Sequence, residues 1–211
     1  STSRRQRQMC IRDRGQSILM QNYRQFIHQE YGVRQLLVEH THFNDPEKRE
    51  HIRRLLIRAA QQKTIPIVNY NDPVSDEENR KMELAIRRSH GDQVVECVDN
   101  DETAAVIANL VHAKKLVLMT STEGIYRDPA DPKTLVEQVT VKSMEELEEK
   151  VRQLQESCVG ASRAGANGAK AKLEYALKSA RQGTMVIIGH ARHRLSDLVE
   201  GRVACTRIGL E

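Results

Sequence analysis

The sequence predicts an α/β protein, a three-layer αβα sandwich in which helices cover both faces of a mostly parallel sheet. Short apolar segments typical of buried strands alternate with longer segments of helical periodicity. Several of the predicted strands are followed directly by polar residues, as is typical of the carboxyl edge of a parallel sheet. A chain of 211 residues, 39% of them hydrophobic and 29% charged, is long enough for such a domain.

The first half of the chain supplies two predicted strands and two helices. Apolar residues have helical spacing from Gln16 up to a break at Gly32, and residues 33–38 form a predicted buried strand. A helix is expected after Asn44, with Asp45 as its N-cap and Pro46 in its first turn. A second short strand follows over residues 65–68.

Strand–helix alternation continues in the middle of the chain. Residues 75–92 are polar and charged, and we interpret them as an exposed excursion. Residues 94–98 form the third predicted strand, residues 103–111 a buried helix, and residues 116–119 the fourth strand.

The last third of the chain begins with a turn-rich segment, residues 123–132, which contains two Asp-Pro pairs. An amphipathic helix is predicted around residues 144–154. A glycine-containing loop and its helix come next, then a strand over residues 185–188. Residues 203–208 are expected to form a closing strand.

Charge distribution argues against a nucleic-acid partner. The net charge is +4, but residues 1–14 hold five arginines against one aspartate, and the rest of the chain is balanced. Aromatic residues make up only 3% of the chain, which leaves little surface for base stacking. We expect the basic tail to be disordered and the chain to bind no nucleic acid.

Cysteine usage and hydropathy predict a cytoplasmic protein without a membrane partner. The four cysteines are far apart and form no Cys-x-x-Cys pair, so reduced thiols are expected rather than disulfides or a zinc site. The chain has no secretory signal and no run of about 18 apolar residues that could span a bilayer.

Residues 165–172, Gly-Ala-Asn-Gly-Ala-Lys-Ala-Lys, combine a glycine loop, two lysines and the start of a helix. Glycine lets backbone N–H groups approach an anion, and a helix N-terminus and lysine add positive charge. The segment therefore has the chemistry of a phosphate cradle, although it matches neither common nucleotide-loop motif. A flexible surface loop before an ordinary helix remains the alternative.

Polar clusters follow three of the predicted strands. They are residues 69–73 (Asn-Tyr-Asn-Asp-Pro), residues 99–101 (Asp-Asn-Asp) and the pair Thr120 and Ser121. At the carboxyl edge of a sheet such clusters predict a ligand site. Asp72 and Asp101 could instead serve as helix or turn caps.

Taken in order, these motifs resemble the amino acid kinase superfamily, and within it the glutamate 5-kinases. The matching features are Gln35-Leu36-Leu37-Val38, the three polar clusters, residues 124–129 (Gly-Ile-Tyr-x-x-Asp-Pro) and the glycine loop with its lysine. The resemblance extends from about Gly15 to Thr206. It implies an amino-acid-kinase-like sandwich that uses ATP and Mg²⁺ to phosphorylate the side-chain carboxylate of glutamate for proline biosynthesis, in a cytoplasmic homo-oligomer.

The resemblance also implies a role for each matching residue. The acceptor glutamate would be bound by Asn69, Asp72 and Asn100. The nucleotide would be contacted by Thr120, Ser121, Gly165, Ala166, Asn167 and Gly168. Two residues would act on the transferring phosphoryl group: Lys172 would bind phosphate, and Asp101 would organise lysines or Mg²⁺ around it.

This sequence departs from the family pattern at four positions. Glycine is usual where it has Val98 and Cys205, aspartate where it has Ser121, and glutamate where it has Tyr70. These departures leave the acceptor open among the superfamily's other substrates: uridylate, acetylglutamate, aspartate and carbamate. A non-catalytic nucleotide-binding or oligomerisation module is a further alternative.

The larger departure concerns the family's first strand, which carries a Lys-x-Gly-Ser-type motif. No such motif occurs in the 211 residues. We therefore expect residues 1–14 to be foreign sequence joined to a domain, residues 15–211, that lacks its N-terminal strand. Because that strand supplies a phosphate-binding lysine, we expect impaired activity.

The histidines are not expected to bind a metal. His40 and His42 have no third ligand at a diagnostic spacing and are predicted to be solvated. His190 and His193, together with Arg192 and Arg194, are interpreted as a basic surface loop in preference to a phosphate contact.

Overall fold

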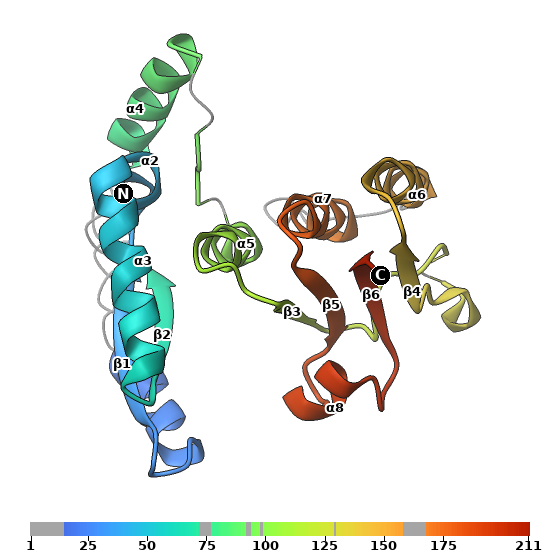
Figure 1. Cartoon of the computed structure of the whole chain (residues 1–211), viewed down its shortest axis with the longest axis horizontal. Helices are drawn as coiled ribbons and strands as arrows, with labels where there is room; N and C mark the ends of the chain where they lie inside the picture. The colour runs from blue at the N-terminus through green and yellow to red at the C-terminus, as the bar shows by residue number, and fades with distance from the viewer. Residues whose placement is uncertain (1–14, 72–76, 92–93, 98, 129, 158–167) are drawn as a thin grey trace, which may run out of the picture. The chain divides into compact units, whose positions relative to one another are not determined.

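The computed structural model describes residues 15–71, 77–91, 94–97, 99–128, 130–157 and 168–211 (Figure 1). The basic tail, Asp72, Val98, Gly165, Ala166 and Asn167 lie outside these ranges. The chain divides into two compact units, Ser1–Asn100 and Asp101–Glu211, which are described separately.

The first unit is built around two parallel strands. Residues 15–26 are helical, and then come β1 (Gly32–Val38), α2 (His40–Asn44), α3 (Pro46–Gln61), β2 (Thr64–Tyr70) and α4 (Glu77–Ser89). Strands β1 and β2 pair in parallel from Gly32 opposite Thr64 to Val38 opposite Tyr70. Helix α3 runs alongside them (Figure 1). This arrangement confirms both predicted strands and the helix between them.

The predicted start of α3 is confirmed in detail. Pro46 is its first residue, and the Asp45 side chain accepts a hydrogen bond from the Lys48 backbone N–H at 2.9 Å. The same hydrogen bond is the main cause that lowers the pKa of the Asp45 carboxyl below its usual value, because it favours the ionised form.

Two expectations for the first unit were wrong, and a third was incomplete. The charged segment 75–92 is exposed over residues 81–91 apart from Leu84 and half-buried Arg87, as expected, but it contains a helix, α4. Strand β1 is not buried, since Val38 is its only buried residue. Residues 94–97 form no strand, because the Asn44 side chain takes both main-chain groups of Val95: it donates to the carbonyl at 2.7 Å and accepts from the N–H at 2.8 Å.

The second unit is a three-layer sandwich. Its elements are α5 (Asn100–Leu110), β3 (Lys115–Thr120), the 3₁₀ turn η2 (Pro132–Thr134), β4 (Gln138–Val141), α6 (Met144–Ser157), α7 (Gly168–Ala180), β5 (Met185–His190), α8 (Leu195–Glu200) and β6 (Cys205–Leu210). The strand order is β3-β5-β6-β4. Only the β5–β6 pair in this sheet is antiparallel. The predicted fold class, a mostly parallel α/β sandwich, is therefore confirmed.

Alternation along β5 places one helix layer on each face of this sheet. Val186 and Ile188 pack into the core that α5, α6 and α7 cover, whereas Ile187 packs with Leu198 of α8 on the other face (Figure 1). All four of these side chains are fully buried. Strand β4 was not predicted: its four residues alternate polar and apolar, but so short a segment gives only a weak signal.

Among the described residues, no helix combines the length and the apolarity needed to cross a bilayer.

Gly124 allows the chain after β3 to pass close to β6. The Ile125 N–H donates to the Thr206 hydroxyl at 2.8 Å, and Thr206 is fully buried. A Cβ at position 124 would lie 2.3 Å from that hydroxyl oxygen and 2.9 Å from the Thr206 backbone nitrogen. The first residue of the Gly-Ile-Tyr motif is therefore required for packing.

We expect Gly124→Ala to lower the free energy of unfolding by about 1–3 kcal/mol, the usual cost of overpacking a tight contact. Urea denaturation measures this loss. The control is Gly15→Ala, whose Cβ would meet no atom within 4 Å and which should change stability by less than about 0.5 kcal/mol. Equal effects of the two substitutions would contradict the packing argument.

Candidate functional site

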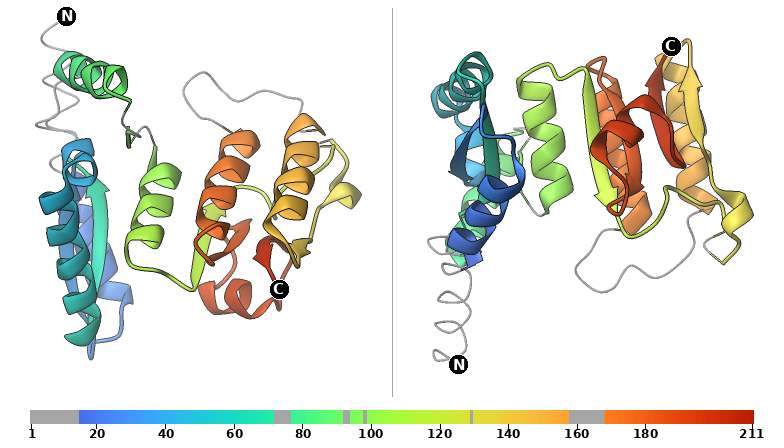
Figure 2. Two further views of the ribbon diagram at one scale, coloured as in Figure 1. Left: turned by 45° about the horizontal axis from the view of Figure 1, so that its top comes forward. Right: turned by 90° about the horizontal axis from the view of Figure 1, so that it is seen from below.

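The carboxyl edge of β3 and β5 collects most of the predicted site residues of the second unit. Helix α5 leads directly into β3, and α7 leads directly into β5, so both helices begin at this edge (Figure 2). Because β6 is antiparallel to β5 and parallel to β4, these two strands also begin here. Two helix N-termini with partial positive charge therefore face one sheet edge.

The most informative contact at this edge is an ion pair between Lys172 Nζ and Asp101 Oδ2. Asp101 lies in the first turn of α5, and Lys172 lies near the start of α7. The Lys172 side chain is only 19% exposed and the Asp101 side chain only 26%. The structure thus brings together two residues that are 71 positions apart and that the sequence analysis assigned to the same phosphoryl group.

Thr120 and Ser121 lie at the same edge. Thr120 is the last residue of β3, where it pairs with His190, and its carbonyl accepts the Ala191 N–H at 2.8 Å. Thr120 is half-buried and Ser121 is exposed. Both are therefore placed where a ligand bound at the edge could reach them.

The glycine loop falls partly outside the described residues, since Gly165, Ala166 and Asn167 are not included. Gly168 is the first residue of α7 and has a φ of 44°, a conformation that favours glycine. Helix α6 begins at the opposite edge, after β4, and therefore ends at the edge where α7 begins (Figure 2). Both described ends of the loop thus reach the site edge.

Of the predicted acceptor residues, Asn69 and Asp72 belong to the first unit, and Asn100 is the last residue of that unit and the first of α5. Strand β2 extends through Tyr70, so Asn69 lies inside the strand and not in a loop, and its side-chain oxygen accepts the Tyr70 N–H at 2.9 Å. Asn100 is exposed at the start of α5, and Asp72 lies outside the described residues. That these residues face Lys172 stays a prediction.

The expectation that His40 is solvated was wrong. His40 is buried, its Nε2 lies 3.0 Å from Glu83 Oε2, and its Nδ1 lies 3.4 Å from the Tyr70 hydroxyl. His42 Nδ1 accepts the Glu39 N–H at 2.8 Å, which caps α2. The sequence around His40 could not reveal these contacts, because Glu83 lies 43 residues further along the chain, on α4, which was not predicted as a helix.

Sequence reasoning also missed a half-buried carboxylate at the site edge. Glu123 is 17% exposed and pairs with both Arg192 and His193, whose Nε2 lies 2.6 Å from Glu123 Oε2. His193 is half-buried. The segment after β5 is therefore not simply a basic surface loop.

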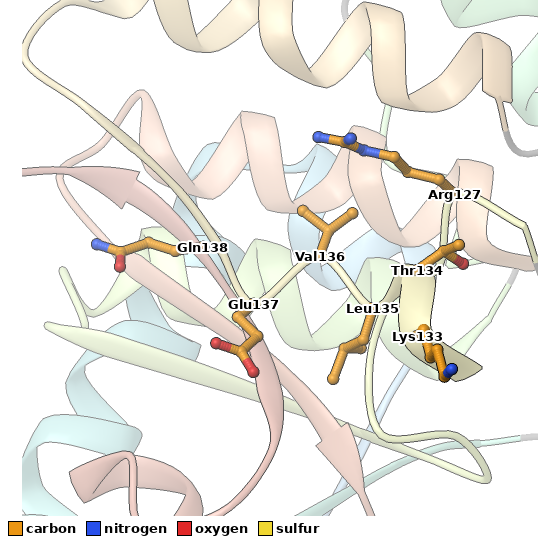
Figure 3. Close-up of a pocket in the computed structure, with 7 residues that line it drawn as sticks. All are labelled: Arg127, Lys133, Thr134, Leu135, Val136, Glu137 and Gln138. Carbon is orange, nitrogen blue, oxygen red and sulfur yellow. The ribbon is translucent and has the colours of Figure 1, made fainter. Parts of the chain in front are cut away.

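A polar pocket of about 470 Å³ opens beside η2 and the start of β4 (Figure 3). Its lining is mixed in charge: Arg127, Lys133, Thr134, Leu135, Val136, Glu137 and Gln138. The pocket is large enough for a small molecule, although its lining is more polar than that of most ligand pockets. In the described part of the chain, no group of three or more His, Cys, Asp or Glu side chains could hold a metal ion.

Comparison with protein families gives a match to the amino acid kinase family over residues 9–190. Among curated proteins, the chain is 31% identical over 200 residues to a glutamate 5-kinase of Geobacillus thermodenitrificans, which covers 93% of the chain and 48% of that protein. It is 29% identical over 199 residues to glutamate 5-kinase 1 of Bacillus subtilis, with 92% and 49% covered. The chain thus spans about half the length of these relatives.

Among solved structures, the carbamate kinase from Giardia lamblia bound to AMP-PNP aligns with 75% of the chain and 44% of its own length. The TM-score is 0.51 at 15% sequence identity, which supports the fold alone. The family match covers most of the chain, and the three-layer sheet agrees with it. The chain belongs to the amino acid kinase family.

Proposed function

We propose that this chain is part of an ATP-dependent kinase that phosphorylates the side-chain carboxylate of glutamate. The observation that supports this most is the ion pair between Lys172 and Asp101 at the N-termini of two helices. The glutamate 5-kinase relatives suggest the acceptor. The Asn-Tyr-Asn-Asp and Asp-Asn-Asp clusters favour the same substrate, an acid that also bears an amine.

The chemistry of the reaction fits these residues. Phosphoryl transfer depends on positioning and on neutralising charge more than on covalent steps by the protein. A carboxylate acceptor is already ionised at neutral pH, so the reaction needs no strong general base. Lys172 and the N-terminus of α7 would neutralise the phosphates, while Thr120, Ser121 and residues 165–168 would hold the nucleotide.

Asp101 would have two tasks in this proposal. It holds Lys172 in place through their ion pair, and its carboxylate offers a ligand to Mg²⁺. A single carboxylate is compatible with this ion, because Mg²⁺ in kinases is held by one or two carboxylates together with substrate phosphates. When bound, Mg²⁺ would supply charge neutralisation at the phosphates.

On the acceptor side, Asn69, Asp72 and Asn100 would bind the amino group and the carboxylates of glutamate. Tyr70 stands where the family usually has glutamate, and its hydroxyl lies 3.4 Å from buried His40. Tyr70 removes a carboxylate from the family pattern, while Glu83 supplies one 3.0 Å from the same histidine. The choice of acceptor is therefore tested directly.

Glutamyl hydroxamate formation from glutamate, ATP, Mg²⁺ and hydroxylamine tests the reaction. We expect hydroxamate to form with glutamate, because an ionised carboxylate acceptor needs no general base and Lys172 would neutralise the phosphates. Uridylate, aspartate, acetylglutamate and carbamate, tested as competing acceptors, should give no product. If the protein prefers one of these acceptors, the assignment of glutamate as substrate is wrong, but the assignment of the chain as part of a kinase stands.

Nucleotide binding gives a second test that does not need turnover. We expect Lys172→Met to weaken AMP-PNP binding about tenfold or more in calorimetry, since a charge-assisted contact to phosphate is lost. The matched control is Lys178→Met, on the same helix, whose lysine pairs with Glu174 at 2.7 Å on an exposed surface. Binding that is equally weakened by both substitutions would refute the assignment of Lys172.

If the unmodified chain binds AMP-PNP but releases no ADP from ATP in the presence of any of these acceptors, a nucleotide-binding module is the better description. If it binds no nucleotide, the kinase proposal is wrong for this polypeptide.

A further inference from the structure

Two loops at the carboxyl edge of the second sheet are tied together by one side chain, Glu123. The first loop follows Thr120, the last residue of β3, and begins with Ser121; the second follows His190, the last residue of β5, and comprises residues 191–194. Glu123 lies in the first loop, and its two partners, Arg192 and His193, lie in the second. Because 69 and 70 residues separate Glu123 from these partners, the contact joins distant segments.

The second loop is organised so that both partners can reach the same carboxylate. The Arg192 N–H donates to His190 Nδ1 at 3.0 Å, and the His193 N–H donates to the His190 carbonyl at 3.1 Å. The rings of His190 and His193 meet edge to face at 6.2 Å. These contacts fold the loop back on the end of β5, where His190 pairs with Thr120.

The first loop is held from its other side as well. The Ile125 N–H donates to the buried Thr206 hydroxyl of β6, and Gly124 packs against the same residue. Glu123 is the residue directly before this fixed point. The short segment from Thr120 to Gly124 is thus held at Thr120 by the Ala191 N–H, at Glu123 by Arg192 and His193, and beside Gly124 by Thr206.

Only 17% of the Glu123 side chain is exposed, and removing a carboxylate from water costs free energy unless its oxygens find hydrogen-bond partners. Both oxygens of Glu123 have such a partner. Removing its charge would leave Arg192 and His193 without their shared acceptor and would release the second loop from the first. Thr120 and Ser121, which the proposed function places against the nucleotide, lie three and two residues before Glu123 in the same short segment.

We propose that Glu123 is a positioning residue of the nucleotide site: through Arg192 and His193 it locks the loop after β5 onto the loop after β3 and so holds Thr120 and Ser121 in a binding-competent arrangement. This inference rests on the proposed function, since it presupposes that a nucleotide binds at this edge. Glu123 itself does not touch the nucleotide. Its contribution is to keep the two loops ordered before the nucleotide binds, so that binding does not have to meet the entropy cost of ordering them.

The test compares Glu123→Gln with Glu148→Gln by calorimetry with AMP-PNP. Glu148 makes an ion pair of similar kind, 2.8 Å from Arg181, but at the opposite edge of the same sheet, where α6 begins and α7 ends. We expect Glu123→Gln to weaken AMP-PNP binding about three- to tenfold, the loss typical of a less preordered site. Glu148→Gln should change it less than about twofold.

Steady-state kinetics separate positioning from a general loss of structure. Glu123→Gln should raise the KM for ATP and leave both kcat and the KM for the acceptor nearly unchanged. Arg192→Gln and His193→Gln, which leave Glu123 in place, should also weaken nucleotide binding. Adding His193→Gln to Glu123→Gln should cause less further loss than it causes alone, because the two residues act through one contact.

The outcomes distinguish this inference from the function on which it rests. If the unmodified chain binds AMP-PNP and the Glu123, Arg192 and His193 substitutions leave that affinity unchanged, the positioning role is wrong while the kinase proposal stands. A fall in kcat and a rise in both KM values together would also reject it, in favour of a purely structural role. If the unmodified chain binds no nucleotide, both proposals fail.

Discussion

The contact between Lys172 and Asp101 is the interaction on which the account of the site depends. It joins the N-terminal ends of α5 and α7, the two helices that lead into the neighbouring strands β3 and β5. A lysine held by a carboxylate beside two helix N-termini keeps a positive charge at one place before any ligand binds. Preordered charge of this kind is what phosphoryl transfer requires of a protein.

The sheet topology explains why the chemistry gathers at this edge. Each helix is antiparallel to the strand that follows it, so helix starts and the carboxyl ends of β3 and β5 coincide. The loops that leave these strands are then free to differ in sequence, provided that they are held in place. In this chain Thr206 and Glu123 hold the first loop from two sides, and Gly124 permits the close approach that one of these contacts needs.

Local physics made part of the structure predictable. The Asp45–Pro46 start of α3, the apolar run of α5 and the apolar spacing of α6 depend on neighbouring residues, and all three helices were found, although only three residues of α5 are buried. The strand predicted over residues 94–98 is not formed in its described part, residues 94–97. There the side chain of Asn44, which is distant in sequence, takes the backbone hydrogen bonds of Val95. Asp101 and Lys172 were paired in advance only through a family resemblance, and the Glu123 contacts have no local signature at all.

Hydrogen–deuterium exchange with and without AMP-PNP tests most directly the claim that a nucleotide binds at the carboxyl edge of β3 and β5. The account predicts that added nucleotide slows exchange in the starts of α5 and α7 and in the loops that follow β3 and β5. The amino ends of the same two strands, near Lys115 and Met185, should exchange as before. Protection confined to other parts of the chain, with these four segments unchanged, would contradict the account.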